Sequence, residues 1–339
     1  MKHFRKVLEA EDYTLIFDSS LGIEILEGND GKPDPFFLHL PSMIDVGIMG
    51  HCINSCHFCY QGHIKEANMK LDDFKLIIDQ THNHTNQVAL GGRGDPNLHE
   101  NFKEIIEYAR NNNVVPNYTT SGNGLTDEQI EISKLCGAVA VSDYGQPYTY
   151  DAIKRFMDAG IKTNIHIIFN KLNYEKCINI LSGFDPWLPI HSRVKKETEV
   201  DISRINAVIF LLYKAVGEAK DKPELYPTKY QMNIFINRVL NPECKFKVGI
   251  DSCLTNHIIK SGIDLSEEFL MTTDSCEAAR MSTYISPSLQ MVPCSFADHC
   301  VHGVEIKKKS IKNIWNKSKK FKSFRNVLKE KPYDCPLEV

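Results

Sequence analysis

Three cysteines lie close together in the first fifth of the sequence. Cys52, Cys56 and Cys59 are separated by three and then two residues, in the segment GHCINSCHFCYQ. Thiolates are the usual ligands of iron–sulfur clusters, and a short loop with this spacing can wrap one cluster. A 4Fe–4S cluster has four irons, so three local cysteines leave one iron without a protein ligand, and an open position of this kind accepts a small ligand. A zinc site or unrelated thiols are the alternatives.

The segment resembles the signature of the radical S-adenosylmethionine (radical SAM) superfamily, which has this cysteine spacing and an aromatic residue before the last cysteine, here Phe58. In that family the open iron binds the amino and carboxylate groups of SAM, and electron transfer releases a 5′-deoxyadenosyl radical that abstracts hydrogen from a substrate. The resemblance implies that Cys52, Cys56 and Cys59 hold the catalytic cluster. It also implies SAM as a bound cofactor and an electron donor such as flavodoxin or ferredoxin.

A glycine-rich turn, LGGRGDPN, follows the second predicted strand. Glycines let a ligand approach the backbone closely. The turn resembles the family's glycine–glycine–glutamate loop, which contacts the amino group of SAM. Gly91 and Gly92 match that loop, but Arg93 stands where the glutamate usually is, so the acidic role falls to Asp95 or is absent. A purely structural turn is the alternative.

Polar residues also occur at the ends of, or within, later predicted strands. Ser121 and Asn123 lie in the segment TTSGNG, where a hydroxyl and an amide suit ribose hydroxyls or a carboxylate, with ordinary turn chemistry as an equal alternative. Other polar side chains interrupt apolar runs and would either face a ligand cavity or be satisfied in the core. They are Ser142, Asp143, Asn164 and His166.

The C-terminal part of the sequence is rich in cysteine. Cys276 and Cys294 flank SPSLQMVP, and Cys335 follows in YDCP, after a helical stretch with a predicted apolar face. These features resemble the Twitch and SPASM domains of certain radical enzymes, which bind auxiliary iron–sulfur clusters. The resemblance implies one auxiliary cluster on these three cysteines, with Cys253 preferred to Cys300 as fourth ligand. An open site that binds substrate and a zinc knuckle on the same thiolates are the alternatives.

The C-terminal resemblance has departures. Leu289 stands where the family usually has a glycine, and the chain ends in CPLE rather than in C-x2-C. A full SPASM domain needs further cysteines for two clusters, so one cluster fits better. We interpret Cys136, Cys177 and Cys244 as small buried hydrophobic residues, with a hydrogen-donor role for any thiol that faces the cavity as the alternative.

An α/β fold would bring these groups together. Six apolar strand-like runs, starting at residues 44, 87, 115, 138, 163 and 207, alternate with amphipathic helical stretches, the pattern of parallel βα units. Helices are predicted at 71–82, 100–112, 126–135, 150–160, 173–183 and 229–240, the third with Thr126 as its cap. Six repeats are two short of an eightfold barrel. The sequence therefore predicts a partial (β/α)6 barrel of the radical SAM type, with ligands at the carboxyl ends of its strands.

Three parts are expected along the chain. Residues 1–42 form an N-terminal hairpin or lid, residues 43–250 the partial barrel, and residues 251–339 a small auxiliary-cluster domain. Residues 185–204 are expected to be an irregular connection. A further strand is predicted at 246–251, and the basic run at 307–322 is interpreted as a solvated helix face.

Composition excludes several classes of protein. Of 339 residues, 42% are hydrophobic and 24% charged, as in globular proteins, and a net charge of -3 gives no overall attraction to nucleic acid or anionic membranes. The N-terminus lacks an apolar signal core, and no apolar run could span a membrane, so the cytoplasm is the expected location. Eleven cysteines, an odd number, favour metal or thiol chemistry over disulfides in a reducing compartment.

The predicted function is reductive cleavage of SAM followed by hydrogen abstraction. A peptide is the favoured substrate, because the enzymes that this architecture resembles mostly modify ribosomally made peptides. Only 42 residues precede Met43, too few for a separate leader-peptide-binding domain, and this keeps a small-molecule dehydrogenase acting on an alcohol or sugar as an alternative. A non-catalytic iron–sulfur or zinc-binding protein is the third candidate.

Overall fold

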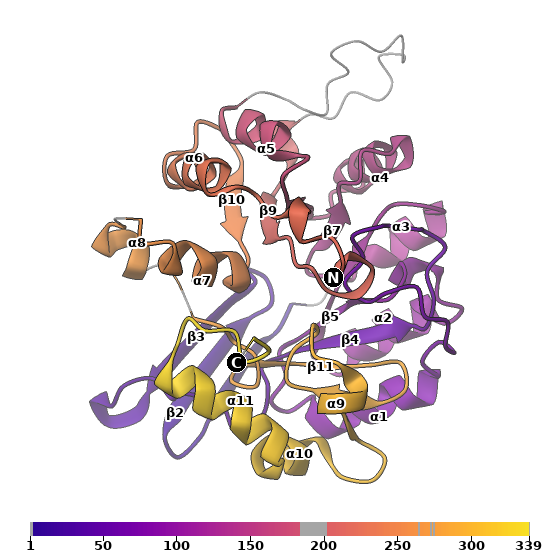
Figure 1. Ribbon diagram of the computed structural model, residues 1–339. Coiled ribbons are helices and arrows are strands. Elements are labelled where there is room, and N and C mark those ends of the chain that lie inside the picture. Colours follow the sequence, from indigo (N-terminus) through magenta and orange to yellow (C-terminus); the bar gives the residue numbers. More distant parts are fainter. Residues whose placement is uncertain (1–2, 184–201, 264, 272, 274, 339) are drawn as a thin grey trace.

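The fold is built on one ten-stranded, mostly parallel sheet with helices around it (Figure 1). The computed structural model describes residues 3–183, 202–263, 265–271, 273 and 275–338, so most of the predicted irregular connection lies outside the described residues. Six parallel strands lie side by side in chain order, as the sequence predicts. They are β4 (Met43–Met49), β5 (Gln87–Gly92), β6 (Val115–Thr120), β7 (Val139–Ser142), β8 (Thr163–Phe169) and β9 (Ala207–Leu212).

The C-terminal strands extend both edges of this sheet. The predicted strand β10 (Lys247–Ile250) pairs in parallel with β9. At the other edge, β11 (Ser282–Ile285) pairs in parallel with β4, and β12 (Gln290–Val292) and β13 (Val304–Glu305) follow in antiparallel order. Residues beyond the barrel therefore continue its sheet, and the boundary at residue 251 stays a prediction.

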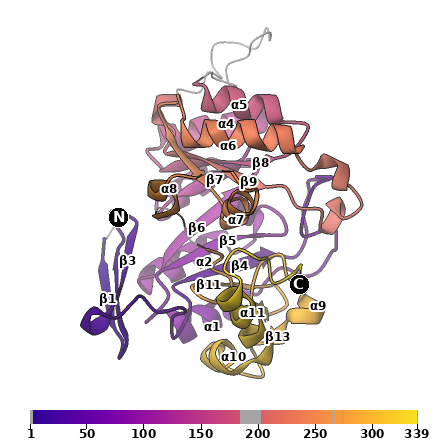
Figure 2. The same cartoon turned by 60° about the vertical axis from the view of Figure 1, so that its left-hand side comes forward.

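Six helices connect the parallel strands and cover the outer face of the sheet (Figure 2). They are α1 (Leu71–Thr81), α2 (Phe102–Asn111), α3 (Asp127–Ser133), α4 (Pro147–Asp158), α5 (Tyr174–Leu181) and α6 (Lys229–Leu240), and each coincides with a predicted helix to within a few residues. Shorter helices follow at α7 (Ser252–Lys260), α8 (Glu267–Met271) and α9 (His299–His302). Within the part of the chain that the structure describes, every helix is too short or too polar to cross a bilayer.

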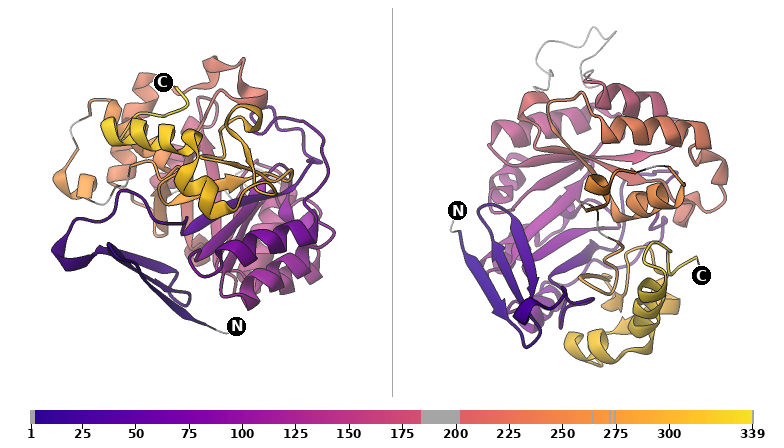
Figure 3. Two further views of the ribbon diagram at one scale, coloured as in Figure 1. Left: turned by 90° about the horizontal axis from the view of Figure 1, so that it is seen from below. Right: turned by 90° about the vertical axis from the view of Figure 1, so that its left-hand side faces the viewer.

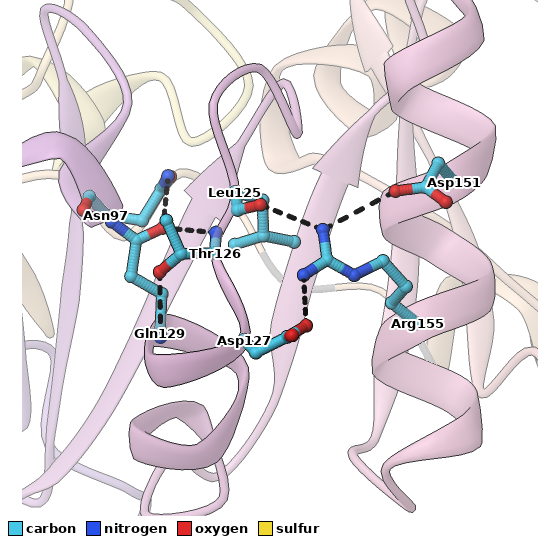
Figure 4. A network of polar contacts seen from close by, with 7 residues as sticks. All are labelled: Asn97, Leu125, Thr126, Asp127, Gln129, Asp151 and Arg155. Atoms are coloured by element: carbon cyan, nitrogen blue, oxygen red, sulfur yellow. Dashed lines mark hydrogen bonds and ion pairs between the residues drawn. The ribbon is translucent and has the colours of Figure 1, made fainter.

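Polar contacts tie the helix starts to the carboxyl ends of the strands (Figure 4). Thr126 and Gln129 form the reciprocal capping box that the predicted cap implies. The Gln129 amide also donates to the Asn97 carbonyl oxygen, 2.5 Å away, and Arg155 of α4 donates to the Leu125 carbonyl oxygen at 2.8 Å. These bonds fix the loop that follows β6 relative to the loop that follows β5.

The predicted C-terminal helical stretch is divided in two. Ser318, with extended backbone angles, separates α10 (Ile311–Lys317) from α11 (Lys319–Glu330). Trp315 is fully buried and its indole N–H donates to the Leu38 carbonyl oxygen at 2.7 Å. Lys312, Lys317, Lys319 and Lys322 are exposed, as expected for a solvated basic face.

The N-terminal segment is a small antiparallel sheet of three strands, β1 (Arg5–Glu9), β2 (Tyr13–Asp18) and β3 (Ile23–Gly28), which Figure 3 shows at the periphery. The predicted hairpin is β2 and β3; β1, with only two apolar residues, is an addition. Lys6 Nζ donates to the carbonyl oxygens of His82 and Thr85, which precede β5. The sheet therefore borders the amino-terminal ends of the barrel strands, and its role as a lid stays a prediction.

Candidate cofactor and substrate site

A cavity of about 530 Å³ lies at the carboxyl ends of the parallel strands, where the sequence predicts the ligand site. Cysteines from both predicted cluster sites contribute to its lining. Cys52, Cys56 and Cys59 line it from the loop between β4 and α1, and three C-terminal cysteines line it from the other side. These are Cys253, Cys276 and Cys294.

The three-cysteine loop has the donor set of a cluster site. All three thiols are partly buried, and burial raises the pKa of Cys52 and Cys59, and that of Cys56 to about 11. The protein alone therefore favours protonated thiols, and a bound metal must stabilise the thiolate form. The loop is held in place through its backbone: the Glu218 N–H donates to the Cys59 carbonyl oxygen at 2.9 Å, and Lys222 donates to that of His57 at 2.8 Å. The residues present fit an iron–sulfur cluster.

A buried carboxylate anchors the same loop from the barrel side. Asp95 accepts hydrogen bonds from the Ser121 N–H and hydroxyl, both at 2.6 Å, and from the Asn54 amide at 3.2 Å. Asn123 in turn donates to the Asn54 side-chain oxygen at 3.0 Å. Ser121 and Asn123 do not line the cavity; they join the cysteine loop to the ends of β5 and β6. Sequence reasoning missed Asn54, although its place between two predicted ligands is a signal for such a role.

The two glycines of the turn differ in the space around their Cα atoms. A Cβ atom added at Gly91 would meet nothing within 4 Å, and this glycine lines the cavity. Gly92 has φ of 90°, and an added Cβ would come within 2.7 Å of the Tyr284 hydroxyl. Gly91 therefore leaves room for a ligand, whereas Gly92 makes the turn and accommodates the phenol.

Arg93 does not line the cavity. It is buried, its guanidinium pairs with Glu66 at 2.5 Å, and it donates to the Gln61 carbonyl oxygen at 3.2 Å. Both partners follow the three cysteines in the chain. The arginine therefore stabilises the segment that follows the three cysteines. Because Arg93 does not line the cavity, its predicted contact with a cofactor stays a prediction.

Of the polar residues predicted in the later strands, two line the cavity and two do not. Ser142 and His166 are partners in the sheet and line the cavity, and burial lowers the pKa of His166 to about 4, so its imidazole is neutral. Asn164 lies deeper, where it accepts a hydrogen bond from Asn206 at 2.7 Å. Asp143 pairs with Lys176 at 2.6 Å and does not line the cavity.

Aromatic rings form the wall beside the cysteine loop. Phe58, the aromatic residue of the signature, packs against Tyr144 with ring centroids 5.3 Å apart, and both line the cavity. Burial raises the pKa of Tyr60, the next aromatic residue along the loop, to about 12. This wall keeps the neighbourhood of the cysteines apolar, which excludes water from them.

Four cysteines from distant segments meet around Lys214. Cys253 begins α7, Cys276 precedes β11, Cys294 follows β12 and Cys335 follows α11. Lys214 Nζ lies 2.7 Å from Cys253 Sγ and interacts electrostatically with Cys294 and Cys335. Burial raises the pKa of Cys253 and of Cys294 to about 12, so these thiols also need a metal to become thiolates.

This C-terminal set has the thiol donors that an iron–sulfur cluster or a zinc site needs. Among the described residues, no three His, Cys, Asp or Glu side chains are placed to hold one metal ion. A 4Fe–4S cluster does not require its cysteines to meet at one point, because they bind different irons. Cys300 is exposed in α9 and does not line the cavity.

The remaining cysteines belong to the core. Cys136 and Cys177 are buried, and Cys244 is partly buried and packs against the core. None of the three lines the cavity. Their geometry agrees with the interpretation as small hydrophobic residues.

Comparison with known proteins places the C-terminal part in a family. Residues 276–336 match SPASM, an iron–sulfur cluster-binding domain. No curated protein sequence matches the chain. Streptococcus suis SuiB bound to the precursor peptide SuiA is similar in structure, with a TM-score of 0.68 and 13% identity over 99% of this chain and 100% of that one.

Two further solved structures are similar to this chain. SuiB bound to S-adenosylmethionine has a TM-score of 0.66 and 13% identity, over 99% of this chain and 100% of that one. The protein anSMEcpe with bound AdoMet has a TM-score of 0.61 and 14% identity, over 87% of this chain and 81% of that one. The chain has the fold of radical SAM enzymes and carries a SPASM domain. The predicted fold class and the resemblance to this superfamily are confirmed.

The backbone conformation at Leu289 accounts for one departure from the SPASM pattern, the leucine in place of a glycine. Leu289, which stands where the family usually has glycine, has φ of 61°, in the left-handed region that glycine adopts without strain. The leucine side chain is buried at 3% exposure, so packing in the core offsets the strained backbone. The turn between β11 and β12 thus keeps the conformation that a glycine would favour. Cys294 lies shortly after β12.

Several cavity residues were missed by sequence reasoning. Lys214 stands at the C-terminal cysteines, and Asp45, Tyr284 and Glu277 also line the cavity. Asp45 interrupts the apolar run MIDVGIM, which is the same signal that singled out His166. Tyr284 and Glu277 carry no comparable signal, since their strand and its place beside β4 are apparent only in the folded chain.

Proposed function

We propose that this chain is a radical SAM enzyme, which cleaves SAM reductively and abstracts hydrogen from a substrate. One observation carries the proposal: a single cavity of about 530 Å³ is lined by the three-cysteine loop on one side and by C-terminal cysteines on the other. When bound at Cys52, Cys56 and Cys59, a 4Fe–4S cluster supplies the electron that breaks SAM into methionine and a 5′-deoxyadenosyl radical. The solved structures with bound SAM support the same assignment.

Residues of the chain bind SAM and hold the cysteine loop in position. Gly91 offers an unobstructed backbone for SAM next to the cluster loop, and Phe58 with Tyr144 shields it from water. Asp95 holds Asn54, and thereby the loop, at the ends of β5 and β6. Ser142 and His166 face the same cavity and contribute neutral polar contacts.

A second site is proposed for one auxiliary iron–sulfur cluster. Cys276, Cys294 and Cys335 come from the SPASM domain, and Cys253 precedes it. Their convergence on Lys214 supports a shared centre, and the cation would offset part of the negative charge that four thiolates bring. Cys253, Cys276 and Cys294 line the cavity, so they would hold a cluster beside the substrate, where it would supply electron-transfer chemistry. We also propose a flavodoxin or ferredoxin as external electron donor, and action in the cytoplasm.

A peptide is the proposed substrate class. SuiB, whose solved structure contains its precursor peptide, resembles this chain over nearly its whole length, which supports that choice. A small alcohol or sugar is the second candidate that the same cavity would admit.

Deuterium transfer tests the substrate class. The anaerobically reconstituted protein is incubated with SAM, dithionite and a deuterated candidate, and 5′-deoxyadenosine is analysed by mass spectrometry. Deuterium in 5′-deoxyadenosine from a peptide encoded beside the gene supports a peptide maturase. Deuterium from a small alcohol or sugar, with none from the peptide, rejects the peptide and favours the dehydrogenase.

A further inference from the structure

We propose that Asp45 recognises a cationic group of the substrate, an alkylammonium or guanidinium, in the cavity between the two cysteine sites. This inference rests on the proposed function, because it assigns a chemical class to the substrate of the same cavity. The argument uses the position of Asp45, the charges around it and an unpartnered hydroxyl beside it.

Asp45 lies on the inner face of the sheet. It is aligned with Ala89 of β5 and Tyr284 of β11, and all three line the cavity. Within the described part of the chain, no hydrogen bond or ion pair reaches its carboxylate; burial and the negative charge of nearby Glu277 act on it. A carboxylate that is largely withdrawn from water and has no partner is costly unless a ligand supplies one.

Two other carboxylates that line the cavity, Asp95 and Asp251, already have hydrogen-bond partners. Asp95 accepts three hydrogen bonds from Ser121 and Asn54. Asp251 accepts from the backbone N–H groups of Leu254 at 2.8 Å and Leu212 at 3.2 Å. Lys214, a cation among the lining residues, is engaged by Cys253. Asp45 is therefore the carboxylate that a charged ligand would meet.

Tyr284 provides a second, independent observation. It is 1% exposed, lines the cavity and lies beside Asp45 in the sheet. Among the described residues, no hydrogen-bond partner reaches its hydroxyl group, although buried hydroxyls are normally bonded. Tyr284 and Asp45 are neighbours across the sheet, and a carboxylate and a phenol oxygen are both acceptors for the N–H groups of an ammonium or guanidinium.

Glu277 strengthens the preference for positive charge. It lines the cavity near Asp45, close enough to raise the cost of ionising it. The negative charges of Asp45 and Glu277 attract a cation and disfavour an anion, and a neutral isostere of the cation would leave the Asp45 carboxylate unpaired. A lysine or arginine side chain of a peptide, or the amine of a small molecule, meets this requirement.

The test compares two peptides that differ in a single charged group. The probes are the acetylated, amidated pentapeptides Ala-Ala-Lys-Ala-Ala and Ala-Ala-Nle-Ala-Ala, in which norleucine lacks only the ammonium. Binding to the anaerobically reconstituted, SAM-loaded protein is measured by isothermal titration calorimetry. Wild type should bind the lysine peptide at least tenfold more tightly than the norleucine peptide. Asp45→Asn should lose that preference and bind the norleucine peptide within twofold of wild type.

Asp72→Asn is the matched control, because it makes the same chemical change at a side chain that is 95% exposed on α1. It should keep the wild-type preference. Equal affinities in wild type, including no measurable binding of either peptide, would overturn the inference, as would a preference that survives in Asp45→Asn. Formation of 5′-deoxyadenosine by the same wild-type preparation reports separately on the proposed function. A protein that cleaves SAM without any preference refutes only the role of Asp45.

Discussion

Replacing Asp45 by asparagine is predicted to stabilise the protein, increasingly so as the pH rises. Burial, and then the negative charge of Glu277, raise the pKa of Asp45 to about 7. The folded protein therefore holds the proton more tightly than the unfolded chain does. The ionised carboxylate costs stability as the pH rises from about 4 to about 7, and asparagine cannot ionise.

The size of the effect follows from the two pKa values. A folded-state value of about 7 against the ordinary 3.8 corresponds to roughly 4 kcal/mol at about 1.36 kcal/mol per pH unit. An unfolding entropy of about 2.1 cal/mol/K per residue gives roughly 0.7 kcal/mol/K for this chain length. The Tm of Asp45→Asn should thus exceed that of wild type by roughly 2 °C at pH 5 and roughly 6 °C at pH 8.

The assay is thermal unfolding of the iron-free protein under anaerobic, reducing conditions, so that cluster loss does not contribute to the transition. Wild type, Asp45→Asn and the exposed control Asp72→Asn are compared between pH 5 and pH 8. The control should follow wild type at every pH. A difference between wild type and Asp45→Asn that is constant with pH, or that shrinks as the pH rises, would refute the reasoning about this carboxylate.

Three further predictions concern the two cysteine sites. Gly91→Val should fill the space left for SAM and weaken its binding at least tenfold in an anaerobic titration, with the iron content unchanged; unaltered affinity would place SAM elsewhere. The same change at Gly92 is a poorer test, because the Tyr284 hydroxyl leaves no room there. Asn54→Ala removes three side-chain hydrogen bonds that hold the cysteine loop, a loss of about 1–3 kcal/mol, and should speed the chelation of the iron bound there; an unchanged rate argues against the anchor. Cys294→Ala should lose about four irons per chain and substrate modification while keeping some SAM cleavage, whereas stoichiometric zinc lost in place of iron would support the zinc knuckle.

The strand order and the cluster loop could be predicted because they rest on local patterns. Each barrel strand is a short apolar run followed by an amphipathic helix, and parallel βα units place their carboxyl ends at one edge. The resemblance also predicts that Cys253 and Cys335 share one centre, and in the folded chain both lie near Lys214. The helix cap at Thr126 is equally local and could be predicted for that reason.

What the sequence could not show are the contacts between distant segments. Ser121 and Asn123 have the chemistry of ligands, but in the folded chain that chemistry is used to tie down the cysteine loop. Arg93 sits at a motif position and yet turns toward Glu66, which no local pattern reveals. The pairing of β11 with β4, which brings Tyr284 beside Asp45, joins residues more than two hundred positions apart.

The most direct test of the central claim is the formation of 5′-deoxyadenosine by wild type and by the triple variant Cys52→Ala, Cys56→Ala, Cys59→Ala. Both proteins are reconstituted anaerobically, their iron is counted, and each is given SAM and dithionite. The account predicts that wild type forms 5′-deoxyadenosine, and that the triple variant forms none while keeping the iron held by the C-terminal cysteines. A triple variant that still forms 5′-deoxyadenosine, or an iron-loaded wild type that never does, would contradict the account.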